Sequence, residues 1–115
     1  MAIKRIEAVI RPEMLEPLRI HLEEMGYPGM MVTEIEGHGK QGGTDMQWRG
    51  IKIRTKFLPK VRVEVVTTDK HSRKVIDTII ETCRSGKVGD GKIFVSDIKD
   101  AIRIRTKERG EKAVA

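Results

Sequence analysis

The sequence is poor in cysteine and in long apolar runs. Cys83 is the single cysteine among 115 residues, so no internal disulfide can form. Its place in an apolar helical pattern predicts a buried, unreactive side chain, which suits a reducing compartment. No apolar run reaches the roughly 18 residues of a membrane span, and no export signal is evident. We therefore expect a cytoplasmic protein.

Aromatic residues are also scarce, at 3% of the chain. RNA-recognition domains built on a sheet stack bases on aromatic side chains of their central strands. Here only Phe94 lies in a predicted strand, whereas Trp48 and Phe57 lie in or beside a loop. The three histidines are far apart and lack the spacing of metal ligands, so the sequence offers no catalytic cluster either. The pattern favours a protein that is not an enzyme.

The chain carries a basic excess, with a net charge of +6. Such a charge suits an acidic ligand: a nucleotide, a nucleic acid or the headgroup side of a membrane. A basic nucleic-acid-binding module therefore remains the alternative to a sensor of small anions. The length is that of one domain, here residues 1–115.

The spacing of apolar residues changes period several times along the chain. Helical spacing predicts one helix between Glu13 and Gly26 and a second that Asp69 caps and that ends before Gly86. Alternation predicts strands at 3–10, 30–37, 60–68 and 92–98, with a short extended stretch at 102–105. The order βαββαβ is that of a ferredoxin-like α+β fold, with both helices on one face of an antiparallel sheet. Apolar residues on both sides of several strands predict that other copies cover the second face, so we expect a homo-oligomer.

Two polar segments are candidates for function. The glycine-rich stretch 37–56 is unusually long for a loop in a small domain, and such loops are commonly mobile or binding elements. The segment 85–92 contains glycine, four residues, glycine and lysine, as a P-loop does. However, Ile93 stands where a P-loop has serine or threonine, and a strand follows instead of a helix. This segment is either a plain glycine turn or a site that holds an anion on backbone N–H groups and Lys92.

Several motifs together resemble one family over residues 3–110. "MMVTEIEGHGKQGG", "WRG", "FLPKV", "SGKVGDGKIF" and "IRIRT" occur in the order and spacing of the PII nitrogen-regulatory signal proteins. The resemblance implies a homotrimer of ferredoxin-like subunits that binds ATP or ADP in clefts between subunits and senses 2-oxoglutarate beside magnesium-ATP. It also implies that the loop 37–56 docks on ammonium transporters or on enzymes of nitrogen assimilation.

The resemblance assigns most of the nucleotide contacts. In the family, the turn at Gly89, Asp90, Gly91 and Lys92 wraps the nucleotide phosphates. Arg103 and Arg105, in the C-terminal segment 103–115, reach the same phosphates. Two arginines at this spacing in an extended segment would point to one side. Glu64 and Val66 correspond to further contacts in the nucleotide pocket, although Val66 is equally well explained as a core residue.

The resemblance also assigns the effector and partner contacts. Gly39, Lys40 and Gln41 match the base of the family's mobile loop, which also belongs to the ATP or ADP site and where the glutamine helps to hold Mg²⁺ and 2-oxoglutarate. Lys60 matches a lysine that pairs with a carboxylate of 2-oxoglutarate. In the loop itself, Trp48 beside Arg49 is a candidate partner contact, because large rigid aromatic side chains often dominate interfaces; the alternative is that Trp48 folds back on its own subunit.

The chain departs from the family at two positions of the motif "MMVTEIEGHGKQGG". Lys40 stands where many relatives have arginine, which removes a bidentate donor. Met31 replaces a common threonine at the adenine end of the pocket, so adenine recognition there must use other groups.

Overall fold

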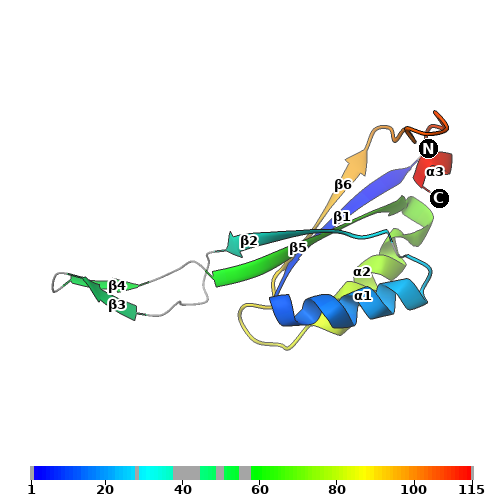
Figure 1. The fold of residues 1–115 in the computed structure, drawn as a ribbon. Helices are drawn as coiled ribbons and strands as arrows, with labels where there is room; N and C mark the ends of the chain where they lie inside the picture. Colours follow the sequence, from blue (N-terminus) through cyan, green and yellow to red (C-terminus); the bar gives the residue numbers. More distant parts are fainter. Residues whose placement is uncertain (1, 28, 38–44, 49–50, 55–57, 115) are drawn as a thin grey trace.

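The computed structural model describes residues 2–27, 29–37, 45–48, 51–54 and 58–114. Within these residues there are six strands, three α-helices and a short 3-10 helix, and Figure 1 shows how the strands and α-helices are arranged. In chain order these are β1 (Ile3–Ile10), the 3-10 helix (Pro12–Met14), α1 (Leu15–Glu24), β2 (Met31–Gly37), β3 (Asp45–Trp48), β4 (Ile51–Arg54), β5 (Leu58–Thr68), α2 (Asp69–Cys83), β6 (Lys92–Ile98) and α3 (Glu111–Val114).

The main sheet has four antiparallel strands in the order β2-β5-β1-β6. α1 and α2 lie side by side on one face of this sheet (Figure 1). The ferredoxin-like arrangement expected from the sequence is confirmed. The four strands expected from alternation match β1, β2, β5 and β6, because a half-buried strand places every second residue in the core.

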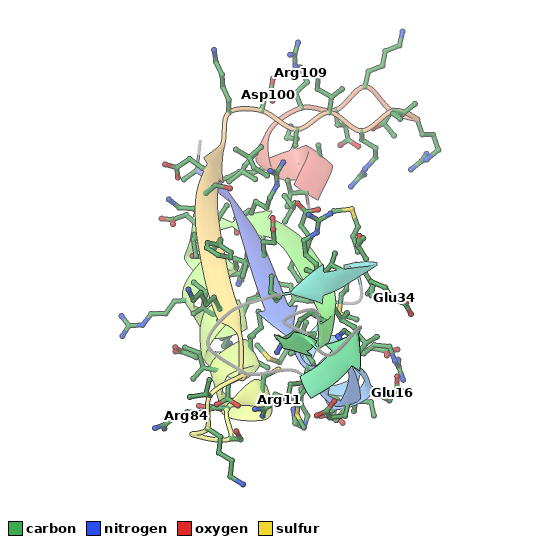
Figure 2. The ribbon with its side chains drawn as sticks, turned by 90° about the vertical axis from the view of Figure 1, so that its left-hand side faces the viewer. Arg11, Glu16, Glu34, Arg84, Asp100 and Arg109 are labelled. Atoms are coloured by element: carbon green, nitrogen blue, oxygen red, sulfur yellow. The ribbon has the colours of Figure 1, made fainter. Side chains whose placement is uncertain are left out.

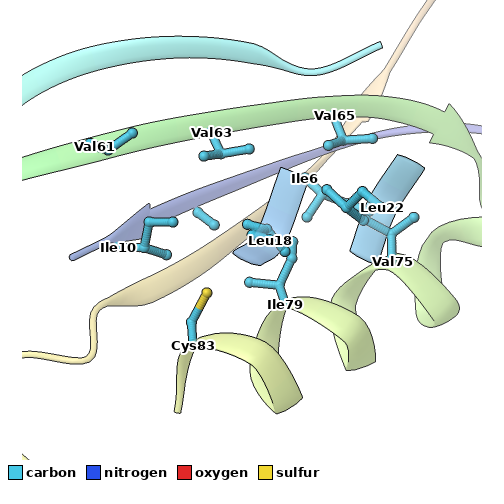
Figure 3. Close-up of a cluster of buried hydrophobic side chains, with 11 residues drawn as sticks. Ile6, Ile10, Leu18, Leu22, Val61, Val63, Val65, Val75, Ile79 and Cys83 are labelled. Carbon is cyan, nitrogen blue, oxygen red and sulfur yellow. The ribbon is translucent and has the colours of Figure 1, made fainter. Parts of the chain in front are cut away.

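The hydrophobic core lies between this sheet and the two helices (Figure 3). Alternate residues of β1 and β5 meet one face of each helix, and the buried cluster consists of Ile6, Ala8, Ile10, Leu18, Leu22, Val61, Val63, Val65, Val75, Ile79 and Cys83. Cys83 is 6% exposed, so its predicted role as a small buried side chain is confirmed. Burial raises the pKa of its thiol to about 11, which keeps it protonated and unreactive at neutral pH.

The structure corrects three local expectations. Asp69 does not cap α2: Thr68 holds the N-cap position with extended backbone and no side-chain capping bond, and Asp69 is the first helical residue. The first helical segment opens as a 3-10 turn at Pro12–Met14, because proline fixes a suitable φ and lacks the N–H that a longer helix would use. The loop 37–56 also contains a two-stranded sheet, β3 and β4, which Figure 1 places beyond the ends of β2 and β5.

The face of the main sheet opposite the helices carries charged and apolar side chains. Met31, Glu64, Glu7 and Phe94 follow one another across this face in the strand register. Met31 is 54% exposed and Phe94 is 55% exposed. Beside them, Arg5 pairs with Glu64 at 2.8 Å. Within the described chain this face is thus open, with large apolar side chains at both edges of the sheet.

Candidate functional site

The glycine turn at 85–91 connects the end of α2 to the start of β6. Three of its residues, Gly86, Gly89 and Gly91, have positive φ. This left-handed backbone disfavours any residue with a Cβ. At Gly91 the restriction is also steric, because a Cβ would lie 1.7 Å from the carbonyl oxygen of Val9. The turn therefore packs directly against the end of β1, and only glycine fits there.

The carboxylate of Asp90 holds the turn together from inside. It accepts hydrogen bonds from the backbone N–H groups of Ser85 at 2.8 Å and Gly86 at 2.9 Å, and from the Ser85 hydroxyl. The Ser85 hydroxyl bond, then these backbone bonds and the nearby Arg11 charge, lower the pKa of Asp90 to about 2. Asp90 is therefore an anion at any physiological pH.

Arg11 ties the same turn to the end of β1. Its guanidinium lies 2.8 Å from the Asp90 carboxylate, and it also donates to the Ser85 hydroxyl at 3.0 Å and to the Val88 carbonyl at 2.9 Å. The planar fork of arginine suits several acceptors at once. Arg11 was not among the site residues predicted from the sequence. Its only signal was a basic residue between a strand and Pro12, which is too common a pattern to indicate a site.

Lys60 approaches the turn from β5. Its ammonium donates to the Gly89 carbonyl at 2.8 Å. Burial, and then the Arg11 charge, lower the pKa of Lys60, whereas Glu13 and Asp90 act in the opposite direction. Lys60 also lines a surface pocket of about 470 Å³ together with Pro12, Glu34, Ile35, Pro59 and Val61. The structure thus brings Lys60 and the turn, which were predicted to bind different ligands, into direct contact.

The two C-terminal arginines lie far from this turn. Figure 2 shows Arg11 and Arg84 at one end of the molecule and Asp100 and Arg109 at the other. The turn adjoins Lys92 at the start of β6, whereas Arg103 and Arg105 follow its end. The seven residues of β6 span about 23 Å at roughly 3.3 Å per residue. The turn and the arginines of one chain therefore do not meet at a common ligand.

The C-terminal segment folds into a turn where an extended stretch was expected. Residues 104–106 form a turn, so Arg105 is not in an extended stretch. Arg103 pairs with Glu108 at 3.1 Å and donates to the Lys112 carbonyl at 3.3 Å. The turn arises because Ile102 bridges to Arg109, which folds the segment back on itself. The expectation of an extended segment at 102–105 is therefore wrong, and the common direction of Arg103 and Arg105 that was inferred from it stays a prediction.

The remaining predicted residues are placed as follows. Glu64 and Val66 lie on β5 and face the open side of the sheet, as their alternation with the buried Val63 and Val65 requires. Lys92 is exposed at the start of β6. Gly39, Lys40, Gln41 and Arg49 lie outside the described residues, and Trp48 belongs to β3.

In the described part of the chain, no group of three or more histidine, cysteine or carboxylate residues could hold a metal ion. Gln41 lies outside that part, so its assignment to Mg²⁺ together with the ATP phosphates stays a prediction. Among the described residues, no helix is long and apolar enough to span a bilayer.

Comparison with known proteins identifies the family. A family model described as "Nitrogen regulatory protein P-II" matches residues 3–108. "Nitrogen regulatory protein P-II" of Pasteurella multocida is 46% identical over 112 residues, which are 97% of this chain and 100% of that one. "Nitrogen regulatory protein P-II 2" of Methanothermobacter thermautotrophicus is 45% identical and covers 97% of both chains.

A solved structure is similar to this chain in sequence and in fold. The crystal structure of Arabidopsis thaliana PII bound to citrate superposes with a TM-score of 0.78 at 37% identity. The match covers 97% of this chain and 89% of that one. Sequence and fold together show that the chain belongs to the nitrogen regulatory protein P-II family.

Proposed function

We propose that the protein is a homotrimeric sensor of ATP or ADP and of 2-oxoglutarate that regulates nitrogen assimilation. The loop 37–56 docks on an ammonium transporter or on an assimilation enzyme, and the ligands set whether it docks. Membership of the P-II family supports a regulatory role, since the relatives are named as regulatory proteins. The protein binds its nucleotide as a signal and does not use it as a substrate for efficient turnover.

One observation carries this proposal: the two groups of cationic residues expected at the phosphates lie at opposite ends of β6, with Lys92 as its first residue and the two arginines beyond its last. Lys92 and the N–H groups of the turn form one half, and Arg103 with Arg105 forms the other. A second copy must supply the missing half, so the complete site lies between subunits. The exposed Met31 and Phe94 on the open face of the sheet support such an assembly, because burying them against another copy removes apolar surface from water.

The chemistry of the turn suits a polyphosphate. Backbone N–H groups in a turn of mixed handedness form an anion-binding concavity, and the ammonium of Lys92 adds a full positive charge beside it. Each charge-assisted contact to phosphate contributes roughly 1.5–3 kcal/mol. Two arginines from the neighbouring copy would then offset the remaining phosphate charge.

Lys60 supports the assignment of a carboxylate effector. Its ammonium lies between the turn and the pocket of about 470 Å³. The citrate in the Arabidopsis structure shows that this relative binds a small polycarboxylate. 2-Oxoglutarate is a dianion that Lys60 balances only in part, so Mg²⁺ on the ATP phosphates, oriented by Gln41, acts as the second positive partner.

Calorimetric titration tests the proposal. We expect saturable binding of ATP and ADP, and binding of 2-oxoglutarate only when ATP and Mg²⁺ are both present. Native mass spectrometry of the same sample should give a mass of three chains. Binding of RNA with a steep salt dependence, without binding of nucleotide, would instead support the nucleic-acid-binding alternative.

A further inference from the structure

Arg11 forms an ion pair with Asp90 of the 85–91 turn, and the nucleotide contacts proposed above do not explain this pairing. We propose that they form a clamp, the Arg11–Asp90 clamp, whose role is to position the turn's N–H groups for phosphate, without either side chain contacting the nucleotide. This inference rests on the proposed function. It assigns the Asp90 side chain a role different from the direct contact that the family resemblance implies.

The contacts of Asp90 are directed inward. Its two carboxylate oxygens are engaged by the N–H groups of Ser85 and Gly86, by the Ser85 hydroxyl and by Arg11. The Arg11 and Asp90 side chains are 19% and 22% exposed. An aspartate bonded in this way closes the turn into a ring, because residues 85 and 86 at its start are held to residue 90 near its end.

Two carbonyl groups of the turn are held by side chains, and this sets the direction of the N–H groups in the same peptide units. The Val88 carbonyl accepts from Arg11 at 2.9 Å, and the Gly89 carbonyl accepts from Lys60 at 2.8 Å. In a trans peptide the C=O and the N–H of one unit point in opposite directions. Anchoring these two carbonyls toward β1 and β5 therefore turns the N–H groups of Gly89 and Asp90 away from those strands. That is the arrangement an anion-binding turn needs.

Electrostatics also favours an indirect role for Asp90. A carboxylate beside a polyphosphate repels it, and the repulsion grows where water is excluded. Pairing with Arg11 neutralises the carboxylate, so the field at the turn is set by the N–H groups and Lys92. A direct contact and a clamp thus predict opposite results when the charge of Asp90 is removed.

The experiment compares ATP affinity among trimers purified as the wild type, Asp90→Asn, Arg11→Ala, Arg11→Lys and the double variant Arg11→Ala/Asp90→Asn. We expect each single change to weaken ATP binding roughly tenfold, because a charge-assisted contact is lost. The double variant should bind about as weakly as Arg11→Ala alone, since both changes break one unit. Arg11→Lys should bind ATP almost as weakly as Arg11→Ala, because an ammonium lacks the planar fork with which a guanidinium reaches two acceptors. Asp97→Asn, the same change at the exposed end of β6, is the matched control and should bind as the wild type does.

A second readout separates positioning from general stability. In NMR spectra of ligand-free trimers, the amide signals of Gly89 and Asp90 should shift in Asp90→Asn and Arg11→Lys, while those of α1 should not. ATP binding in Asp90→Asn that equals or exceeds the wild type would overturn the clamp, and so would additive losses in the double variant. If Asp90→Asn does not fold, Arg11→Lys decides, and unchanged affinity in it rejects the clamp. A wild-type trimer that binds no nucleotide would instead reject the proposed function itself, and the positioning role with it.

Discussion

Mixing two variants that bind ATP weakly tests whether the nucleotide site is shared between copies. Lys92→Ala removes the cation beside the turn, and Arg103→Ala removes a cation at the far end of β6. Each loss corresponds to roughly 1.5–3 kcal/mol, or about a tenfold to hundredfold change in affinity. Because Arg103 already bonds Glu108 and the Lys112 carbonyl, part of its gain on binding phosphate is offset. We therefore expect a loss near tenfold for Arg103→Ala.

Mixed trimers should recover intact sites. When the two variants are refolded together in equal amounts, each cleft pairs a turn from one chain with arginines from another. About one quarter of the clefts then have both halves wild type by random assembly. The mixture is titrated with ATP at a protein concentration between the dissociation constants of the wild type and of the variants. About one quarter of the clefts should then bind ATP tightly. Neither variant alone should show tight sites.

The control is a mixture of two differently tagged Lys92→Ala chains, refolded in the same way. It contains no wild-type turn, so it should show no tight sites. Absence of recovery in the main mixture, with mixed trimers verified by mass, would refute a site shared between copies. Unchanged affinity in either variant alone would refute the residue assignment.

Three further predictions follow from the turn and the loop. Gly91→Ala should lower the free energy of unfolding by at least about 2 kcal/mol, because positive φ and the Val9 carbonyl both oppose a methyl group. Gly86→Ala, whose methyl group would meet open space, should lower it by only about 1 kcal/mol. Equal losses of the two variants in chemical denaturation would contradict this. Asp90 has a folded pKa of about 2, below its usual 3.8, so its contribution is complete above about pH 4 and is lost as the pH falls toward 2. Asp90→Asn should therefore flatten the acid-induced loss of stability in that window, and parallel pH profiles would speak against it. Gln41→Ala should abolish 2-oxoglutarate binding in the presence of Mg²⁺ and ATP while ATP binding persists; calorimetry showing an intact 2-oxoglutarate response would remove Gln41 from the site.

The main sheet and helices are predicted well from the sequence, because burying one side of an element spaces its apolar residues at the period of a strand or of a helix. Val61, Val63 and Val65 alternate with polar residues on β5, and only a strand places all three against the helices. The N-terminus of α2 was less predictable: both Thr68 and Asp69 are residue types that cap helices, and only the backbone geometry shows which of them is helical. The β3–β4 pair was missed because its strands are four residues each, within a stretch rich in glycine.

The candidate site could be predicted only where a residue pattern carries its own signal. Gly91 was visible as part of a glycine turn, and its steric need for glycine agrees with that pattern. Arg11 was not, because its contact with Asp90 joins residues 79 positions apart in the chain. The turn at 104–106 depends likewise on the pairing of Ile102 with Arg109, which no local spacing indicates.

The separation of Lys92 and Arg103 by the length of β6 has a thermodynamic consequence. A ligand held by both ends bridges two chains, so its binding free energy adds to that of assembly. ATP should then slow the exchange of subunits between trimers, and dilution should weaken apparent ATP affinity once trimers begin to dissociate. Bound nucleotide would thus stabilise the trimer, and its apparent affinity would depend on protein concentration. Mixed trimers are therefore best formed before any nucleotide is added.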